Sequence, residues 1–189
     1  LLRQLNSESD SRASSKKGLR RSSIESLTIG ADFFEAEMMA TFLRFLALRE
    51  ALQLQRHTFS FSSEMGFADS ELFDFEEVQK VRELNVLLNS DFTDDQFYQL
   101  RGEELSLSSW MLTSGAINRL FRLCQDGRRR IKMITISTGK RNPMVEAEVF
   151  DGTAAVKCGL RHRIEGVRDT LIVQFSPYYL HAYIDEPEF

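Results

Sequence analysis

The sequence predicts an α+β fold in which about four N-terminal helices precede an antiparallel meander of four to five strands. Helical spacing of apolar residues dominates up to about residue 127, and alternation of apolar and polar residues dominates from residue 131. The formal charge changes sign at the same place. Residues 29–127 hold eight basic and seventeen acidic residues, whereas residues 128–168 hold ten basic and four acidic ones. Helices first and strands second are typical of an α+β domain.

We expect one compact domain, because 189 residues are enough to bury a sizeable core. Residues 1–28 are rich in Ser and lack aromatic residues, so they predict a disordered, flexible tail. The globular domain would span residues 29–189, with a helical layer over 29–127 and a sheet layer over 128–189. Since the sequence begins with Leu1, we also expect it to be a piece of a longer or processed chain.

Four helices are expected in the acidic half. The first runs from Asp32 to about residue 56, and Glu35 completes a capping-box-like pair with Asp32. The second spans about residues 70–89. The third follows the Thr93 and Gln96 pair to about residue 102. The fourth runs from Trp110 to Cys124 and ends before Gly127, which suits a C-terminal cap.

The expected strands follow from a two-residue period. They lie at about residues 131–136, 145–150, 154–160, 171–175 and 180–184. Asp151 and Gly152 predict the tight turn of a hairpin between the second and third of these strands. Because the connections are short, antiparallel pairing is favoured over parallel pairing, which needs long crossovers.

The cationic residues of this half are the first candidates for binding. The set comprises Arg128, Arg129, Arg130, Lys132, Lys140, Arg141, Lys157, Arg161, Arg163 and Arg168. An antiparallel meander would gather Lys140 and Arg141 at one end of the sheet, and Arg128–Arg130 and Arg161–Arg163 nearer the other end. Such clusters bind phosphates of lipid or nucleic acid, or an acidic protein surface. The alternative is that they neutralise the acidic helical layer of the same chain.

The last expected strand supplies a second candidate. Tyr179, His181 and Tyr183 alternate with Leu180, Ala182 and Ile184, so the two trios face opposite sides of a sheet. If the aliphatic trio faces the helices, the aromatic trio faces outward or into a concavity, and exposed Tyr is a common interface anchor. The alternative is a second covered face.

Ser23 is a candidate phosphorylation site, because Arg20 and Arg21 precede it as a basophilic kinase requires. A phosphate would add about −1.5 to −2 charge to a basic segment. The alternative is a solvated linker that no kinase modifies.

No motif predicts catalysis, a metal or a cofactor. Residues 137–141 (STGKR) lack the first Gly and the final Ser or Thr of a phosphate-binding loop. The three histidines, His57, His162 and His181, accompany no hydrolase signature. Cys158 and His162 would lie roughly 13 Å apart along one strand, too far for one zinc ion.

The composition also indicates where in the cell the protein is expected. The longest apolar stretch is about half the ~20 residues that cross a bilayer, so we expect no transmembrane segment. Two cysteines favour a reducing compartment, the cytoplasm or alternatively an organelle matrix.

These observations favour a non-catalytic protein-interaction or assembly module, a subunit or regulatory domain of a larger complex, whose partners are other protein subunits. One alternative is a phosphate-recognising module for anionic lipid or nucleic acid. A second alternative is an enzyme with an unrecognised pocket.

Overall fold

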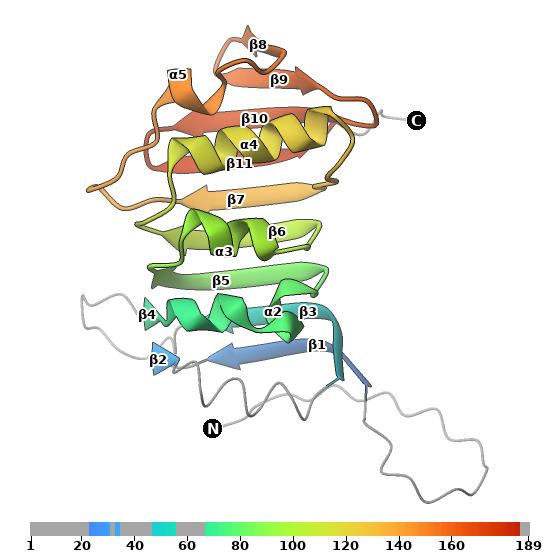
Figure 1. Cartoon of the computed structure of the whole chain (residues 1–189), viewed down its shortest axis with the longest axis vertical. Helices are drawn as coiled ribbons and strands as arrows, with labels where there is room; N and C mark the ends of the chain where they lie inside the picture. The colour runs from blue at the N-terminus through green and yellow to red at the C-terminus, as the bar shows by residue number, and fades with distance from the viewer. Residues whose placement is uncertain (1–22, 31–32, 35–46, 56–66, 186–189) are drawn as a thin grey trace, which may run out of the picture.

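The described residues of the computed structural model are 23–30, 33–34, 47–55 and 67–185, and they build one mixed sheet. Figure 1 shows its strands stacked in the order β1-β3-β5-β6-β7-β11-β10-β9-β8. Neighbours from β1 to β7 are parallel, and neighbours from β7 to β8 are antiparallel. The short β4 pairs in parallel with β2 and β5. The sheet therefore has a parallel half and an antiparallel half that meet at β7.

The strands are β1 Ser23–Gly30, β2 Phe33–Phe34, β3 Ala47–Gln55, β4 Phe67–Ala68, β5 Glu83–Ser90, β6 Glu104–Ser109, β7 Met133–Ser137, β8 Ala155–Cys158, β9 Arg161–Glu165, β10 Thr170–Ser176 and β11 Tyr179–Ile184. The helices are the 3-10 helix η1 Ser70–Asp74 and the α-helices α2 Glu76–Gln79, α3 Asp94–Gln99, α4 Ser114–Gln125 and α5 Glu146–Val149. None of these helices is long and apolar enough to cross a membrane.

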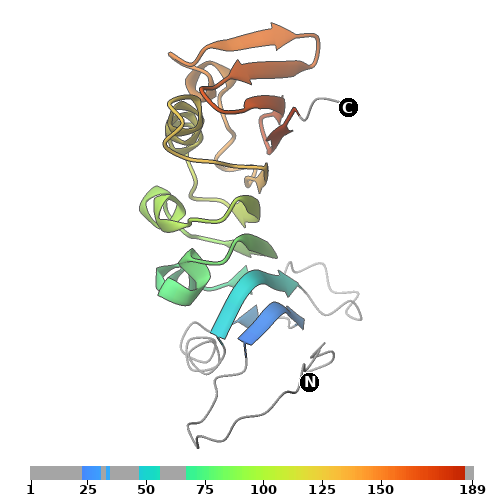
Figure 2. The same cartoon turned by 90° about the vertical axis from the view of Figure 1, so that its right-hand side faces the viewer.

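The helices α2, α3 and α4 lie on one side of the sheet (Figures 1 and 2). The strand order explains this arrangement. The parallel strands β5, β6 and β7 advance in one direction through the sheet, and crossovers of one hand then place every connecting helix on the same side. We call the opposite side of the sheet, which bears no helix among the described residues, the open face.

The core lies between the helices and the sheet. Strand β6 shows the pattern: Leu105 and Leu107 are buried, whereas Ser106 and Ser108 on the other side are partly exposed. Buried side chains from five more strands and from the helices complete the core. They include Leu84, Val86, Leu88, Phe97, Ile117, Leu120, Phe121, Ile134, Ile136, Val149, Ile164, Leu171, Val173, Leu180 and Ala182.

The predicted fold class is wrong: the described part of the chain does not begin with four helices, and its sheet is mixed rather than an antiparallel meander. Strands β2 and β3 occupy part of the helix expected at 32–56, and β5 occupies the end of the helix expected at 70–89. These helix predictions failed because apolar residues four positions apart, such as Leu84 and Leu88, are compatible with a helix and also with one side of a strand. Here β5 buries both residues on one side.

Two helices agree with the sequence. Helix α3 begins after Thr93, whose side chain accepts a hydrogen bond from the Gln96 amide while the Gln96 side chain bonds to the Thr93 amide. Helix α4 ends two residues before Gly127, which adopts a φ of 69°. Trp110, however, lies before this helix, at the end of β6. Strand β6 itself was missed, although its Leu-Ser alternation is a clear strand pattern.

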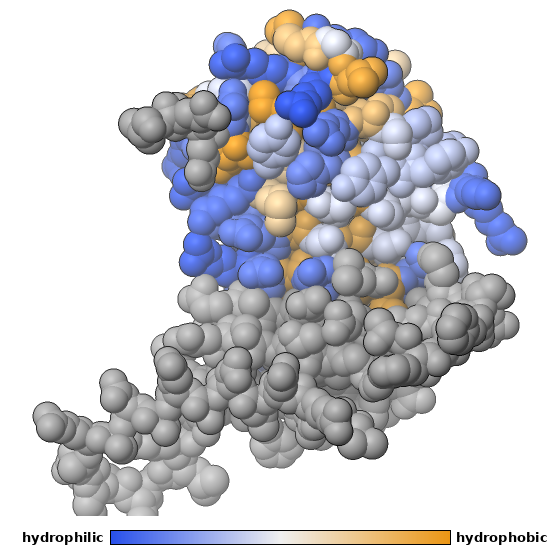
Figure 3. All heavy atoms as spheres, turned by 180° about the vertical axis from the view of Figure 1, so that it is seen from behind, coloured by the Kyte–Doolittle hydropathy of each residue, from blue (hydrophilic) through white to orange (hydrophobic). Residues whose placement is uncertain are grey.

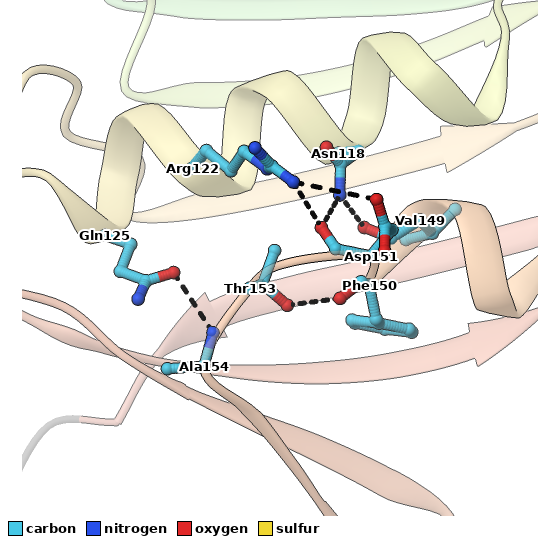
Figure 4. Close-up of polar contacts among 8 residues, drawn as sticks. All are labelled: Asn118, Arg122, Gln125, Val149, Phe150, Asp151, Thr153 and Ala154. Atoms are coloured by element: carbon cyan, nitrogen blue, oxygen red, sulfur yellow. Dashed lines mark hydrogen bonds and ion pairs between the residues drawn. The ribbon is translucent and has the colours of Figure 1, made fainter.

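The segment after β7 also departs from the prediction. Residues 146–149 form α5 rather than a strand, with the Val149 amide donating to the Val145 carbonyl at 2.9 Å. Asp151 and Gly152 follow this helix and do not close a hairpin. Helix α4 fixes the turn instead, as Figure 4 shows. The Asn118 amide group donates to the Val149 and Asp151 carbonyls at 3.0 and 2.7 Å.

Candidate functional site

The open face is built from every second residue of the strands. Register pairs align Asn85, Ser106, Thr135, His181, Gln174 and Arg161 in a row that crosses six strands, from β5 to β9. A second row runs Glu83, Glu104, Met133, Tyr183, Ile172 and Arg163. Figure 3 views the molecule from this side, where side chains of intermediate hydropathy lie beside a strongly hydrophilic region. The face is therefore polar with aromatic and aliphatic side chains at its centre.

The centre of the face is a connected group of side chains from β7, β11 and β9. Thr135 Oγ1 and His181 Nδ1 share a hydrogen bond of 2.9 Å. The rings of His181 and Tyr183 lie 5.5 Å apart, and Arg161 Nη1 donates to the Tyr183 hydroxyl at 3.4 Å. Because Leu180 and Ala182 are fully buried on the other side, the two rings of β11 are held outward. Tyr179, His181 and Tyr183 thus lie on the side of β11 away from the helices, which is one of the arrangements considered from the sequence.

A hydroxyl beside an imidazole is also the geometry of a nucleophile and its base. The surroundings of Thr135 and His181 do not complete such a site. No carboxylate is paired with His181 in the described part of the chain, and the strand amides that would stabilise an oxyanion are engaged in the sheet. Cys124 is also poorly suited to attack, since burial raises the pKa of its thiol to about 11.

Charge on the open face is uneven along the rows. Glu83 and Glu104 are register neighbours on β5 and β6, at one end of the second row. Arg161 and Arg163 lie at the other end, on β9. Both arginines therefore lie within the open face rather than at the end of the sheet expected for them. The open face is therefore acidic on one side and basic on the other.

Several of the predicted binding cations are engaged within the chain. Lys157 Nζ lies 2.6 Å from Glu146, Arg163 lies 3.8 Å from Glu165, and Arg130 lies 3.4 Å from Asp169. The same is true of Lys132, which lies 3.6 Å from Glu103. Intramolecular neutralisation, the alternative considered from the sequence, thus describes part of the set.

The arginines before β7 differ from one another. Arg128 is exposed, whereas Arg129 is partly buried and donates from Nη2 to the Gly102 carbonyl at 3.3 Å. Burial lowers the pKa of Arg129 below its ordinary value. Arg129 is therefore better described as a structural residue than as a binding one.

His162 lies on the helix side of β9, away from the open face. It is 7% exposed and stacks on Phe150 at 3.9 Å, while its Nε2 lies 3.0 Å from Glu146. Cys158 lies opposite Arg161 across the β8–β9 turn, and Lys157 lies opposite His162. Cys158 and His162 thus lie in two strands and on opposite faces, not along one strand as the sequence argument assumed. Among the described residues, no three His, Cys, Asp or Glu side chains are grouped as metal ligands.

Lys140 and Arg141 lie in a turn after β7, where the Asn142 amide donates to the Gly139 carbonyl at 3.0 Å. The turn does not join two hairpin strands, because β7 pairs with β6 and β11. Both cations are exposed, and neither side chain forms an ion pair or hydrogen bond within the described part of the chain. Exposed aromatic residues lie near this turn: Trp110 and Tyr178. Sequence reasoning missed both, since Trp110 was assigned to a helix and Tyr178 precedes the expected strand.

Two predicted features cannot be placed against this surface. Ser23 is the first residue of β1, which begins inside the predicted tail, but Arg20 and Arg21 lie outside the described residues. His57 lies outside them as well.

Comparison of the chain with models of protein families, with curated proteins and with solved structures finds no match. The geometry of the described residues is therefore the basis for a function.

Proposed function

We propose that this chain is a non-catalytic protein-interaction module that docks a partner protein on its open face. The observation that carries the proposal is the outward group Thr135, His181, Tyr183 and Arg161, which joins three strands on the open face. Tyr and Arg are enriched among the residues that dominate binding energies at interfaces. Their side chains here are pre-positioned by a sheet, so little conformational entropy is lost when a partner binds.

The uneven charge of the face supports an oriented complex. Arg161 and Arg163 favour an acidic region of the partner, and Glu83 together with Glu104 favours a basic region. The role is that of a subunit or regulatory domain in a larger assembly, with other protein subunits as its partners.

The alternative, recognition of phosphate groups in anionic lipid or nucleic acid, is less favoured. The described cations are divided between the open face, the turn after β7 and intramolecular ion pairs, so they do not form one basic surface. Binding to phosphates would show a steep dependence on salt concentration, whereas a protein partner held by Tyr183 would show a shallow one.

The chain offers a matched pair of variants for testing the proposal. Arg161 contacts Tyr183 on the open face, and Arg119 lies 4.1 Å above the Tyr98 ring on the helix side. We expect Arg161→Glu to weaken the partner's affinity by about tenfold or more, because it removes a contact and reverses a charge at the interface. Arg119→Glu should change it by less than about twofold.

The measurement has two stages. Partners captured from an extract with the wild-type chain are identified by mass spectrometry, and the affinity of each purified partner is then measured against the wild type and both variants. A partner that loses affinity equally with either variant would contradict docking on the open face. Flotation with anionic vesicles that is abolished by Arg161→Glu would favour the phosphate alternative instead.

A further inference from the structure

The carboxyl ends of the parallel strands carry a second group of exposed side chains. The connections that follow β6 and β7 and the turn that precedes β11 lie at the same end of the sheet (Figure 1). They bring together Trp110, Met111, Lys140, Arg141, Tyr178 and Tyr179, which we call the strand-end patch. Trp110, Tyr178 and Tyr179 are 44%, 47% and 44% exposed, and Met111 is 52% exposed. So much exposed aromatic surface in one place is typical of an interaction site.

Backbone contacts hold the patch in place. The Thr138 amide donates to the Tyr178 carbonyl at 3.0 Å, and the Trp110 amide donates to the Ser90 carbonyl at 3.2 Å. A Cβ at Gly139 would lie 3.1 Å from the Trp110 Cβ, so this glycine allows the turn to lie against the tryptophan. Since neighbouring strands are about 4.8 Å apart, the backbones at Trp110 and Tyr178 lie roughly 10 Å apart, on either side of Gly139.

The turn after β7 is positive. Two acids at this end of the sheet, Asp91 and Asp94, belong to the connection after β5, where Asp94 accepts from the Thr113 amide and hydroxyl. Residues 127–145 contain six basic residues and no acidic one, and residues 108–112 and 170–184 contain no charged side chain. Lys140 and Arg141 are exposed and have no ion-pair partner among the residues that the structure describes. A ligand of this patch therefore needs carboxylates to match the two cations and an apolar side chain to match the aromatic surface.

We propose that the strand-end patch binds a short acidic segment of a partner protein that carries a bulky apolar side chain. The apolar side chain packs between Trp110 and Tyr178, and flanking carboxylates pair with Lys140 and Arg141. This site does not depend on docking at the open face.

Binding is tested with labelled peptides of about ten residues by fluorescence anisotropy, at about 150 mM salt. The probe carries one central Phe flanked on both sides by Glu residues, one control peptide has Ser in place of Phe, and another has Lys in place of Glu. We expect the Glu-Phe peptide to bind at least about tenfold more tightly than either control, because each control lacks one of the two matched chemistries.

Two protein variants locate the site. The double variant Lys140→Glu with Arg141→Glu should weaken peptide binding by about tenfold. The control, Arg128→Glu with Arg168→Glu, makes the same change in net charge beyond the opposite end of β7. It should change the affinity for the peptide by less than about twofold. Tyr178→Ser, in an exposed turn, should weaken binding by about fivefold without affecting the fold.

Several results would overturn the inference. If both double charge-reversal variants lose peptide affinity equally, the peptide is attracted by net charge alone. If the Ser-containing peptide binds as tightly as the Phe-containing one, the site has no apolar anchor. Binding of an oligonucleotide or an anionic vesicle, abolished by Lys140→Glu with Arg141→Glu, would assign the patch to phosphate ligands instead. Arg161→Glu should leave peptide binding unchanged. The proposals for the open face and for the strand-end patch can therefore be tested independently.

Discussion

At the scale of single residues, two glycines differ in what surrounds the place of a side chain. A Cβ at Gly102 would lie 2.8 Å from Leu105 Cδ2 and 3.0 Å from the carbonyl oxygens of Val81 and Arg82. The Arg82 carbonyl is fixed, since it accepts from the amides of Glu103 and Glu104 at 2.8 and 3.1 Å. Gly115, in the first turn of α4, has Thr113 Oγ1 as its nearest neighbour at 3.5 Å.

We predict that Gly102→Ala lowers the free energy of unfolding by about 1–3 kcal/mol, because the added methyl group overlaps backbone that cannot move. Gly115→Ala should be neutral or raise it by up to about 1 kcal/mol, because alanine is the better helix former. Urea denaturation of both variants, followed by circular dichroism, measures the difference. Equal stability of the two variants would show that the β5–β6 connection is looser than the structure indicates.

The open face also depends on single residues whose side chains contact one another. The contact between Thr135 and His181 joins β7 to β11, and the contact between Arg161 and Tyr183 passes over β10. The alternation of residues 179–184 predicts which side chains face outward. It does not predict that Thr135 lies beside His181, because the two residues are 46 positions apart in the chain.

At the scale of elements, α4 organises the segment that leads from α5 to β8. Arg122 Nη2 and the Asn118 side chain both donate to the Asp151 carbonyl, and the Ala154 amide donates to Gln125 Oε1 at 3.2 Å (Figure 4). Side chains on one face of α4 thus form hydrogen bonds with backbone groups of the turn that are not paired in the sheet. The interaction explains why Asp151 and Gly152, a strong hairpin pattern in the sequence, follow a helix here.

We predict that Asn118→Asp destabilises this turn more than Asn118→Ala. The alanine variant loses one partly buried and one exposed hydrogen bond, at a cost of about 1–2 kcal/mol. The aspartate variant loses the same donors and places a carboxylate against two carbonyl oxygens. Hydrogen exchange of the amides at residues 149–154 reports the local opening, and Arg119→Ala, on an exposed residue of the same helix, serves as the control. Exchange as slow in Asn118→Ala as in the wild type would mean that α4 does not hold the turn.

The elements also show where local patterns succeed. Helix α3 was predictable because its cap is local: the Thr93 side chain accepts a hydrogen bond from the amide three residues ahead. The start of α4 was placed too early, at Trp110, although Thr113 accepts from the Ala116 amide in the same way. Strand β5 was not predictable in the same way. Its apolar residues fit two periods, and only the pairing with β3, β4 and β6 selects the strand.

At the scale of the whole molecule, pH should act through the buried His162. Burial lowers the pKa of this imidazole; Glu146 opposes the shift, and Lys157 adds to it. The hydrogen bond from Lys157 lowers the pKa of Glu146. Both groups therefore favour the folded protein near neutral pH, with the imidazole neutral and the carboxylate charged.

The sign of the pH effect follows from the unfolded chain. Unfolded His162 takes up a proton at about pH 6.5, before the folded protein does, so the free energy of unfolding falls as the pH drops below that value. It falls again below about pH 4.5, where unfolded Glu146 becomes protonated first. We predict that the wild type loses more stability than His162→Gln between about pH 7.5 and about pH 5.5.

Urea denaturation at the two pH values provides the measurement. His181 is present in both proteins, so its contribution cancels in the comparison. An identical loss in the wild type and in His162→Gln would show that His162 titrates alike in the folded and unfolded states.

The sequence by itself determined the alternation within β7 and β11, the capping pair of Thr93 and Gln96, the end of α4 before Gly127, and that Tyr179, His181 and Tyr183 lie opposite to Leu180, Ala182 and Ile184. These properties are local, because neighbouring residues fix them through backbone geometry. The tertiary structure alone decided the order of the strands, with β7 between the parallel and antiparallel halves, and hence the two surfaces on which the proposals rest. Strand pairing is set by hydrogen bonds between distant segments and by the burial of one face, and a local pattern records neither the partner nor the register.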